Sequence, residues 1–188
     1  MRIKYNSPTV LTFAFISAIV LILSQTLIPH LTENWFMVPG RRNFSPHRVG
    51  DWIRLFTHVI GHANWNHLIS NFSFILLIGP ILEQTYGSLS LLLMMLVTAV
   101  VTGVLNVMFF PTALLGASGI VFMMILLGSF TNFRSGEIPL TFILILVLYL
   151  GRELFNAVSA PNNNISEFAH IVGGFCGSLF GFFRPARR

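Results

Sequence analysis

Six long apolar runs constrain this chain more than any other feature of its sequence. Lipid offers no hydrogen-bond partner to an open backbone, and the runs lack the strict alternation of apolar and polar residues that is typical of membrane β-strands. We therefore predict an all-α integral membrane protein that forms a single domain over residues 1–188. The predicted spans are residues 9–29, 67–82, 88–110, 113–130, 138–155 and 165–183.

The charge content separates this chain from soluble proteins and excludes several functions. Charged residues make up 9% of the chain, whereas a soluble domain carries roughly 25%. An aspartyl intramembrane protease needs two aspartates, and Asp51 is the only one in the sequence. The net charge of +5 comes from basic clusters near both termini and in the segment 41–54, and no basic stripe interleaves with aromatics on a polar face. The expected partner is therefore the lipid bilayer, and not nucleic acid.

The long connection at residues 30–66 differs from an ordinary polar linker. It mixes tryptophan and other apolar side chains with arginine, a combination that favours the headgroup region of a membrane. We expect this first loop to lie partly in the interface as short amphipathic pieces, anchored by Trp52 and Arg54. Glu83, at the end of the second predicted span, is expected to accept hydrogen bonds from the same loop.

The distribution of basic residues predicts an orientation. Six spans place both termini on the same side of the membrane. When the first loop is set aside, the other side carries Arg152 alone. Short cytoplasmic segments are enriched in Lys and Arg, so both termini are expected in the cytoplasm. The basic residues on the side of the termini are Arg2, Lys4, Arg134, Arg184, Arg187 and Arg188.

Ser118 and His170 are polar residues within predicted spans, where each ionisable or polar group is a functional hypothesis. Ser118 lies in a Gly-Ala-Ser-Gly segment at the start of the fourth span. A serine becomes a useful nucleophile when a base lies beside it, but such small residues also form helix-packing patches. His170 shares one helical face with Gly173, Gly177 and Gly181, and a glycine stripe lets a neighbouring helix approach. His170 is therefore either a base for Ser118 or a structural histidine bonded between helices.

His67 and Asn71 are four residues apart and share a helical face near the start of the second span. Both can donate hydrogen bonds, so together with the backbone N–H of Ser118 they can form an oxyanion hole. The alternative is a polar clamp between helices. In an alternating topology, the second, fourth and sixth spans start on one side of the membrane. His67, Ser118 and His170 are therefore expected at similar depth.

Other site chemistries fit the sequence less well. His58, His62 and His67 follow one another closely, but no carboxylate lies among them and no His-Glu-x-x-His motif is present, so a zinc site is not favoured. A secondary transporter would usually show paired repeats with broken helices at corresponding positions. The sequence shows neither pattern.

Five motifs along the chain resemble those of the rhomboid family, and they occur in the same order. Each motif is modest by itself, whereas five in order on the expected spans form a specific signal. The motifs are Trp52-Ile53-Arg54, His67-x-x-x-Asn71, Gly79-x-x-x-Glu83-x-x-x-Gly87, Gly116-Ala117-Ser118-Gly119 and Ala169-His170-x-x-Gly173-x-x-x-Gly177.

This resemblance implies a bundle of six transmembrane helices with an interfacial first loop and with no metal or cofactor. It implies an intramembrane serine endopeptidase in which Ser118 and His170 form a dyad that works through an acyl-enzyme. His67, Asn71 and the Ser118 amide would hold the oxyanion. The residues that would support this site are Gly116, Gly119, Phe122 and Gly173.

The resemblance also sets expectations about partners and location. The substrates would be single-span membrane proteins, the membrane would be a bacterial inner membrane, and no oligomer would be required. The family often carries tyrosine where this chain has Phe122, which keeps the ring near the base but removes a hydroxyl contact. Two alternatives stay open: a catalytically silent rhomboid-like module that binds membrane proteins, and an enzyme that resolves the acyl-enzyme with an amine in place of water.

Overall fold

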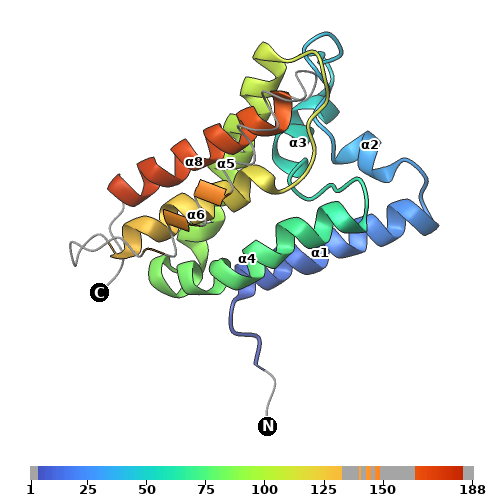
Figure 1. The fold of residues 1–188 in the computed structure, drawn as a ribbon. Coiled ribbons are helices and arrows are strands. Elements are labelled where there is room, and N and C mark those ends of the chain that lie inside the picture. The colour runs from blue at the N-terminus through green and yellow to red at the C-terminus, as the bar shows by residue number, and fades with distance from the viewer. Residues whose placement is uncertain (1–3, 133–139, 141–142, 145–146, 149–163, 184–188) are drawn as a thin grey trace.

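The computed structural model describes residues 4–132, 140, 143–144, 147–148 and 164–183. Its main elements are helices that pack side by side into a bundle, with the first loop at one end (Figure 1). The helices are α1 (Pro8–Thr26), α2 (Leu31–Trp35), α3 (Val49–Thr57), α4 (Trp65–Tyr86), α5 (Ser88–Phe109), α6 (Ser118–Asn132) and α8 (Asn164–Phe183).

The predicted spans can be compared with these helices one by one. Helices α1, α4 and α5 are each long and apolar enough to cross a membrane, and they coincide with the first three predicted spans. Helices α6 and α8 match the fourth and sixth, with shorter apolar stretches at 118–129 and 168–183. The predicted fifth span, 138–155, lies largely outside the described residues. The helical character is confirmed in the described part, whereas the count of six spans stays a prediction.

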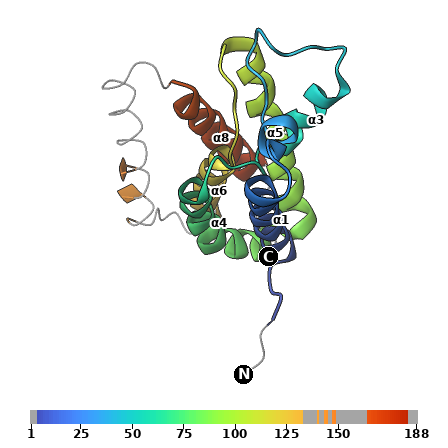
Figure 2. The same ribbon diagram turned by 90° about the vertical axis from the view of Figure 1, so that its right-hand side faces the viewer.

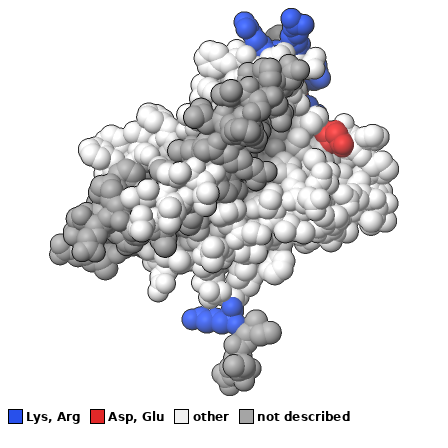
Figure 3. All heavy atoms as spheres, viewed as in Figure 1, with Lys and Arg blue, Asp and Glu red and all other residues white. Residues whose placement is uncertain are grey.

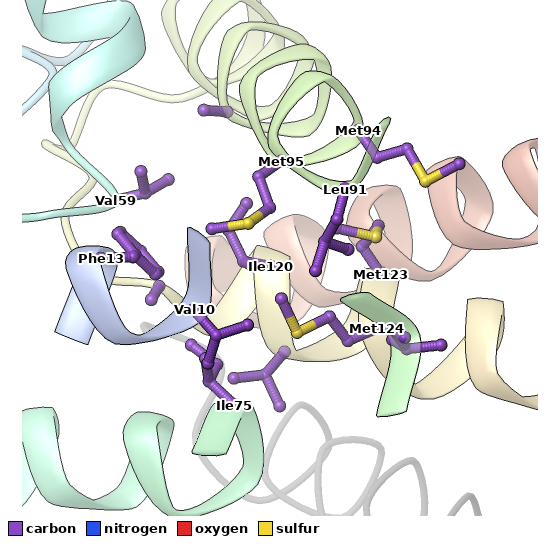
Figure 4. Close-up of a cluster of buried hydrophobic side chains, with 14 of the residues drawn as sticks. Val10, Phe13, Val59, Ile75, Leu91, Met94, Met95, Ile120, Met123 and Met124 are labelled. Carbon is purple, nitrogen blue, oxygen red and sulfur yellow. The ribbon is translucent and has the colours of Figure 1, made fainter. Parts of the chain in front are cut away.

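Helix α6 lies inside the bundle and forms the centre of the core. It contacts α4, α5 and α8, and the view along the bundle shows it between α4 and α8 (Figure 2). Side chains from α1, α4 and α5 pack against those of α6 (Figure 4). A helix that is apolar on all sides is expected in such a buried position. The core residues drawn there include Val10 and Phe13 of α1, Ile75 of α4, Leu91, Met94 and Met95 of α5, and Ile120, Met123 and Met124 of α6.

The start of the fourth span was predicted wrongly. The prediction began at residue 113, but α6 begins at Ser118. The segment before it is extended because the first loop takes its backbone hydrogen bonds. The N–H of Val38 donates to the carbonyl of Leu114 and the N–H of Leu114 donates back, both at 2.9 Å. Gly116 has φ of +110°, a conformation that is incompatible with a helix and is easy only for glycine.

The prediction for Glu83 was also wrong. Its carboxylate lies near the end of α4 and accepts hydrogen bonds from the N–H groups of Thr9 (2.9 Å) and Val10 (3.1 Å). These groups belong to the first turn of α1, and not to the first loop. The first N–H groups of a helix have no partner within the helix, and a negative charge is favourable there. Glu83 therefore caps α1 and fixes it to the end of α4.

The first loop contains the two short helices α2 and α3, where the sequence predicted short amphipathic pieces. On α3, Asp51 and Leu55 are buried, whereas the next residue after each, Trp52 and Phe56, is exposed. The Asp51 carboxylate accepts a hydrogen bond of 2.8 Å from the Arg54 guanidinium, which also donates to the carbonyl of Asn34. Arg54 thus ties α3 to the end of α2, and it anchors the loop as expected. The position of this loop in the membrane interface stays a prediction.

Among the described residues, the charged side chains visible in Figure 3 lie towards the two ends of the molecule. On the face shown in Figure 3, Lys and Arg side chains gather over the first loop and again near the N-terminal end, with uncharged residues between them. Helices α1, α4 and α5 present many exposed apolar side chains along their length. An uncharged, apolar surface of this kind on the described helices is expected of a protein that is surrounded by hydrocarbon.

Candidate active site

Helices α6 and α8 touch through their backbones at two glycines. A Cβ atom added at Gly173 would lie 2.1 Å from the carbonyl oxygen of Gly119, and one at Gly177 would lie 2.2 Å from that of Met123. Because both pairs advance by four residues, the two helices run parallel with their N-terminal ends together. The glycine stripe predicted on α8 therefore does face a neighbouring helix, and that helix is the one that starts at Ser118.

This contact places His170 beside the start of α6. The His170 ring stacks on the Phe122 ring, with centroids 4.4 Å apart and planes 9° from parallel. Phe122 lies one turn after Ser118, so the two residues share a face of α6. His170 is buried (7% exposed), whereas Ser118 is half-buried. Phe122 was expected to pack near His170, and the ring contact is a stack that lies over the face of α6 carrying Ser118.

His67 and Asn71 approach the same point from α4. A Cβ atom at Gly116 would lie 2.6 Å from both Cε1 and Nε2 of His67, and 3.7 Å from Nδ2 of Asn71. Gly116 therefore makes room for the His67 ring directly before the Ser118 turn. Asn64 fixes the start of α4, because its side chain accepts a 2.9 Å hydrogen bond from the His67 backbone N–H. The structure thus places His67 and Asn71 beside the turn that leads into Ser118, where His170 also lies.

Gly116 and Gly119, on either side of Ser118, have different neighbours. Gly116 faces the His67 ring of α4, whereas a Cβ atom at Gly119 would lie 3.3 Å from Thr102 of α5 and 3.4 Å from the carbonyl of Ala169. The backbone N–H of Gly116 donates to the carbonyl of His58 at 2.9 Å. Before Ser118, the chain is therefore held by the first loop and α4, and directly after it by α5 and α8.

Sequence reasoning missed His62, which it considered only as a metal ligand. The His62 ring lies in the loop before α4, and its Nε2 is 3.2 Å from Nδ2 of Asn71. Its ring also packs edge-on against His67, with centroids 5.1 Å apart. The spacing of three histidines before and within the start of a span was a visible signal. An imidazole so close to His67 and Asn71 can orient these predicted hydrogen-bond donors, and that role was open beside metal binding.

His58 and His62 are both held neutral by burial, which lowers the pKa of each to about 4. Nδ1 of His58 lies 3.2 Å from the carbonyl of Leu55, and its Nε2 lies 3.4 Å from the hydroxyl of Thr102 on α5. Among the described residues, no group of three or more His, Cys, Asp or Glu side chains is arranged to hold a metal ion. The histidines of the loop act here as hydrogen-bonding groups that join it to α4 and α5.

Comparisons with known proteins agree on one family. The family model described as the Rhomboid domain matches residues 49–187. Rhomboid protease GlpG of Haemophilus influenzae is 24% identical over 132 residues, which is 69% of this chain and 68% of that protein. Rhomboid-like protein 11, chloroplastic, of Arabidopsis thaliana is 33% identical over 96 residues (50% of this chain and 34% of that protein). Rhomboid-related protein 2 of Mus musculus is 28% identical over 152 residues (74% and 50%).

The match to the plant and mouse proteins spans only a third and a half of their lengths. The family model, by contrast, spans well over half of this chain and includes α3, α4, α5, α6 and α8. The apolar helices, together with this match, identify an integral membrane protein. On these grounds the chain belongs to the rhomboid family.

Proposed function

We propose that this protein is an intramembrane serine endopeptidase that cleaves transmembrane segments of other membrane proteins. The observation that carries the proposal is the parallel contact of α6 and α8, in which the His170 ring stacks on Phe122 one turn from Ser118. A nucleophile requires an adjacent base. Here Ser118 begins α6, and His170 lies in the first half of α8, which the glycines hold against α6.

In the proposed mechanism, Ser118 Oγ attacks the scissile carbonyl while His170 accepts the hydroxyl proton. The tetrahedral intermediate collapses to an acyl-enzyme, and His170 returns the proton to the leaving amine. Water then attacks the ester, and the same imidazole serves as base and acid for the second half. The stack on Phe122 supports this role, because it fixes the ring plane without occupying a ring nitrogen.

The oxyanion would be held by the Ser118 backbone N–H and the side chains of His67 and Asn71. Ser118 is the first residue of α6, and the first N–H groups of a helix point away from it with a partial positive charge. The two α4 side chains face the Gly116 turn directly before this helix. Donors that are already in place when charge develops typically contribute about 3–4 kcal/mol each to a protease transition state.

The proposal extends to substrate and location. The substrates would be single-span membrane proteins whose helices unwind readily near the outer membrane surface, because a hydrogen-bonded helix hides its carbonyls from a nucleophile. Both termini would lie in the cytoplasm of a bacterial cell, with the site opening on the other side of the inner membrane. One chain contains all the proposed groups, so no oligomer is needed.

The test is covalent labelling of the detergent-purified protein with a fluorophosphonate probe, which reacts only with an activated serine. We expect labelling of the parent protein and none of Ser118→Ala or His170→Ala. The exposed His47 provides a matched control, and His47→Ala should label at the parent rate. A folded parent protein that does not label would overturn the proposal and favour a catalytically silent module that binds membrane proteins.

A further inference from the structure

The Asn71 side chain forms a hydrogen bond with His62 of the first loop. Its amide is buried (6% exposed), and Nδ2 lies between Nε2 of His62, at 3.2 Å, and the turn at Gly116. Nδ2 carries two N–H groups, and the bond to His62 uses one of them. The side that faces Gly116 is the side on which the proposed oxyanion would form.

The orientation of the Asn71 amide depends on the Ile60 carbonyl, through the tautomer of His62. Nδ1 of His62 lies 3.0 Å from that carbonyl oxygen, which can only accept, so Nδ1 must carry the proton. In the neutral ring Nε2 is then an acceptor, and it must receive an N–H from Asn71. A flipped amide would place its oxygen against the Nε2 lone pair, and a protonated ring would place two donors together. The Ile60 carbonyl thus fixes the tautomer of His62, and this tautomer fixes the orientation of the Asn71 amide.

The same ring also contacts the other proposed donor. His62 packs edge-on against His67 and tilts against Phe72, with centroids 5.1 Å and 5.7 Å apart. His62 is almost fully buried (1% exposed). Burial also keeps the imidazole neutral, as the acceptor role of Nε2 requires. The His62 ring therefore packs against the face of α4 that carries His67 and Asn71.

We propose that His62 is a positioning residue for the oxyanion site, which fixes the Asn71 amide with one N–H directed at the Ser118 turn. This inference rests on the proposed protease function. His62 does not touch the substrate or the reacting atoms, and it acts through Asn71.

The test compares rate constants for fluorophosphonate labelling, because the phosphonyl oxygen of the adduct occupies the oxyanion site. His62→Phe keeps a ring of similar size but removes the acceptor, and we expect labelling to slow about tenfold, a part of the loss that follows removal of a whole oxyanion donor. His62→Gln restores an acceptor, and it should return the rate to within about threefold of the parent. His47→Phe, at an exposed position of the same loop, should leave it unchanged.

A double-mutant cycle separates positioning from a purely structural role. If His62 acts through Asn71, His62→Phe should slow labelling no further in an Asn71→Ala background. Equal slowing in both backgrounds, or a His62→Phe variant that labels as fast as the parent, would overturn the inference. Either result leaves the proposed function standing as long as the parent labels and Ser118→Ala does not. A parent that fails to label overturns the proposed function itself.

Discussion

The two sides of the candidate site are built in different ways. On one side, α6 and α8 bring Ser118 and His170 together by backbone contact at glycines. On the other side, His67 and Asn71 of α4 are positioned by hydrogen bonds and ring contacts with the first loop. Backbone contacts tolerate no added atom, whereas polar contacts depend on protonation. The contact between α6 and α8 should therefore be disrupted by larger side chains, whereas the contacts of the first loop should be disrupted by low pH.

The largest effect is expected at the backbone contact. In Gly173→Ala, the new methyl group would lie 2.1 Å from the Gly119 carbonyl oxygen, so α8 must move away from α6. A displacement of about 1 Å at a catalytic group can cost about a hundredfold in rate, and we expect fluorophosphonate labelling to fall by at least that factor.

The neighbouring glycine supplies a matched control. A Cβ atom at Gly174 would meet only the Leu126 side chain, at 3.5 Å, which is an ordinary contact. Gly174→Ala should therefore label within about twofold of the parent. The thermal unfolding midpoint of each variant in detergent shows whether it is folded. A folded Gly173→Ala protein that labels at the parent rate would contradict the contact described here.

An intermediate effect is expected from acid on the first loop. Burial lowers the pKa of His58 and His62 from 6.5 to about 4. Between these values the unfolded chain binds protons that the folded protein does not, so folding stability is full above pH 6.5 and falls as the pH drops towards 4. Each histidine should cost up to about 3 kcal/mol at pH 4.

The measurement is the thermal unfolding midpoint in detergent as a function of pH. The midpoint of the parent should fall between pH 6.5 and 4, and His58→Gln should reduce the slope. The exposed His47 is the control, and His47→Gln should keep the full slope. A midpoint that stays constant over this range would show that the loop histidines are not buried in the neutral form.

The smallest effect on labelling is expected at Glu83, near the end of α4. This position tests whether the protein can lose stability without a loss of labelling rate. Glu83→Gln weakens the cap on Thr9 and Val10 of α1, and the loss of a charged acceptor for buried N–H groups should cost about 1–3 kcal/mol. The unfolding midpoint should fall, while labelling of the folded protein stays within about twofold. Glu33→Gln, at an exposed glutamate, should change neither. Slow labelling by folded Glu83→Gln would mean that the α1–α4 junction also positions the site.

Much of the site could be predicted because its signals are local. The glycine stripe with His170 predicted a close neighbouring helix, and α6 fills that role. The spacing of His67 and Asn71 predicted a shared face, and both residues do face the Gly116 turn. What could not be predicted was the surrounding support. Nothing local in the sequence indicates that His62 meets Asn71 or that the carbonyl of His58 accepts the N–H of Gly116.

The sequence by itself determined the helices and the order of the motifs, because transfer of apolar residues from water and helical periodicity are properties of each segment alone. Only the tertiary structure decided where α6 begins and which groups Glu83 binds. Residues 113–117 are as apolar as the span that follows, but the backbone groups of Leu114 bond to Val38 and the N–H of Gly116 bonds to His58. Hydropathy measures whether a segment leaves water, whereas the partner of each backbone and polar group depends on which distant segment folds against it.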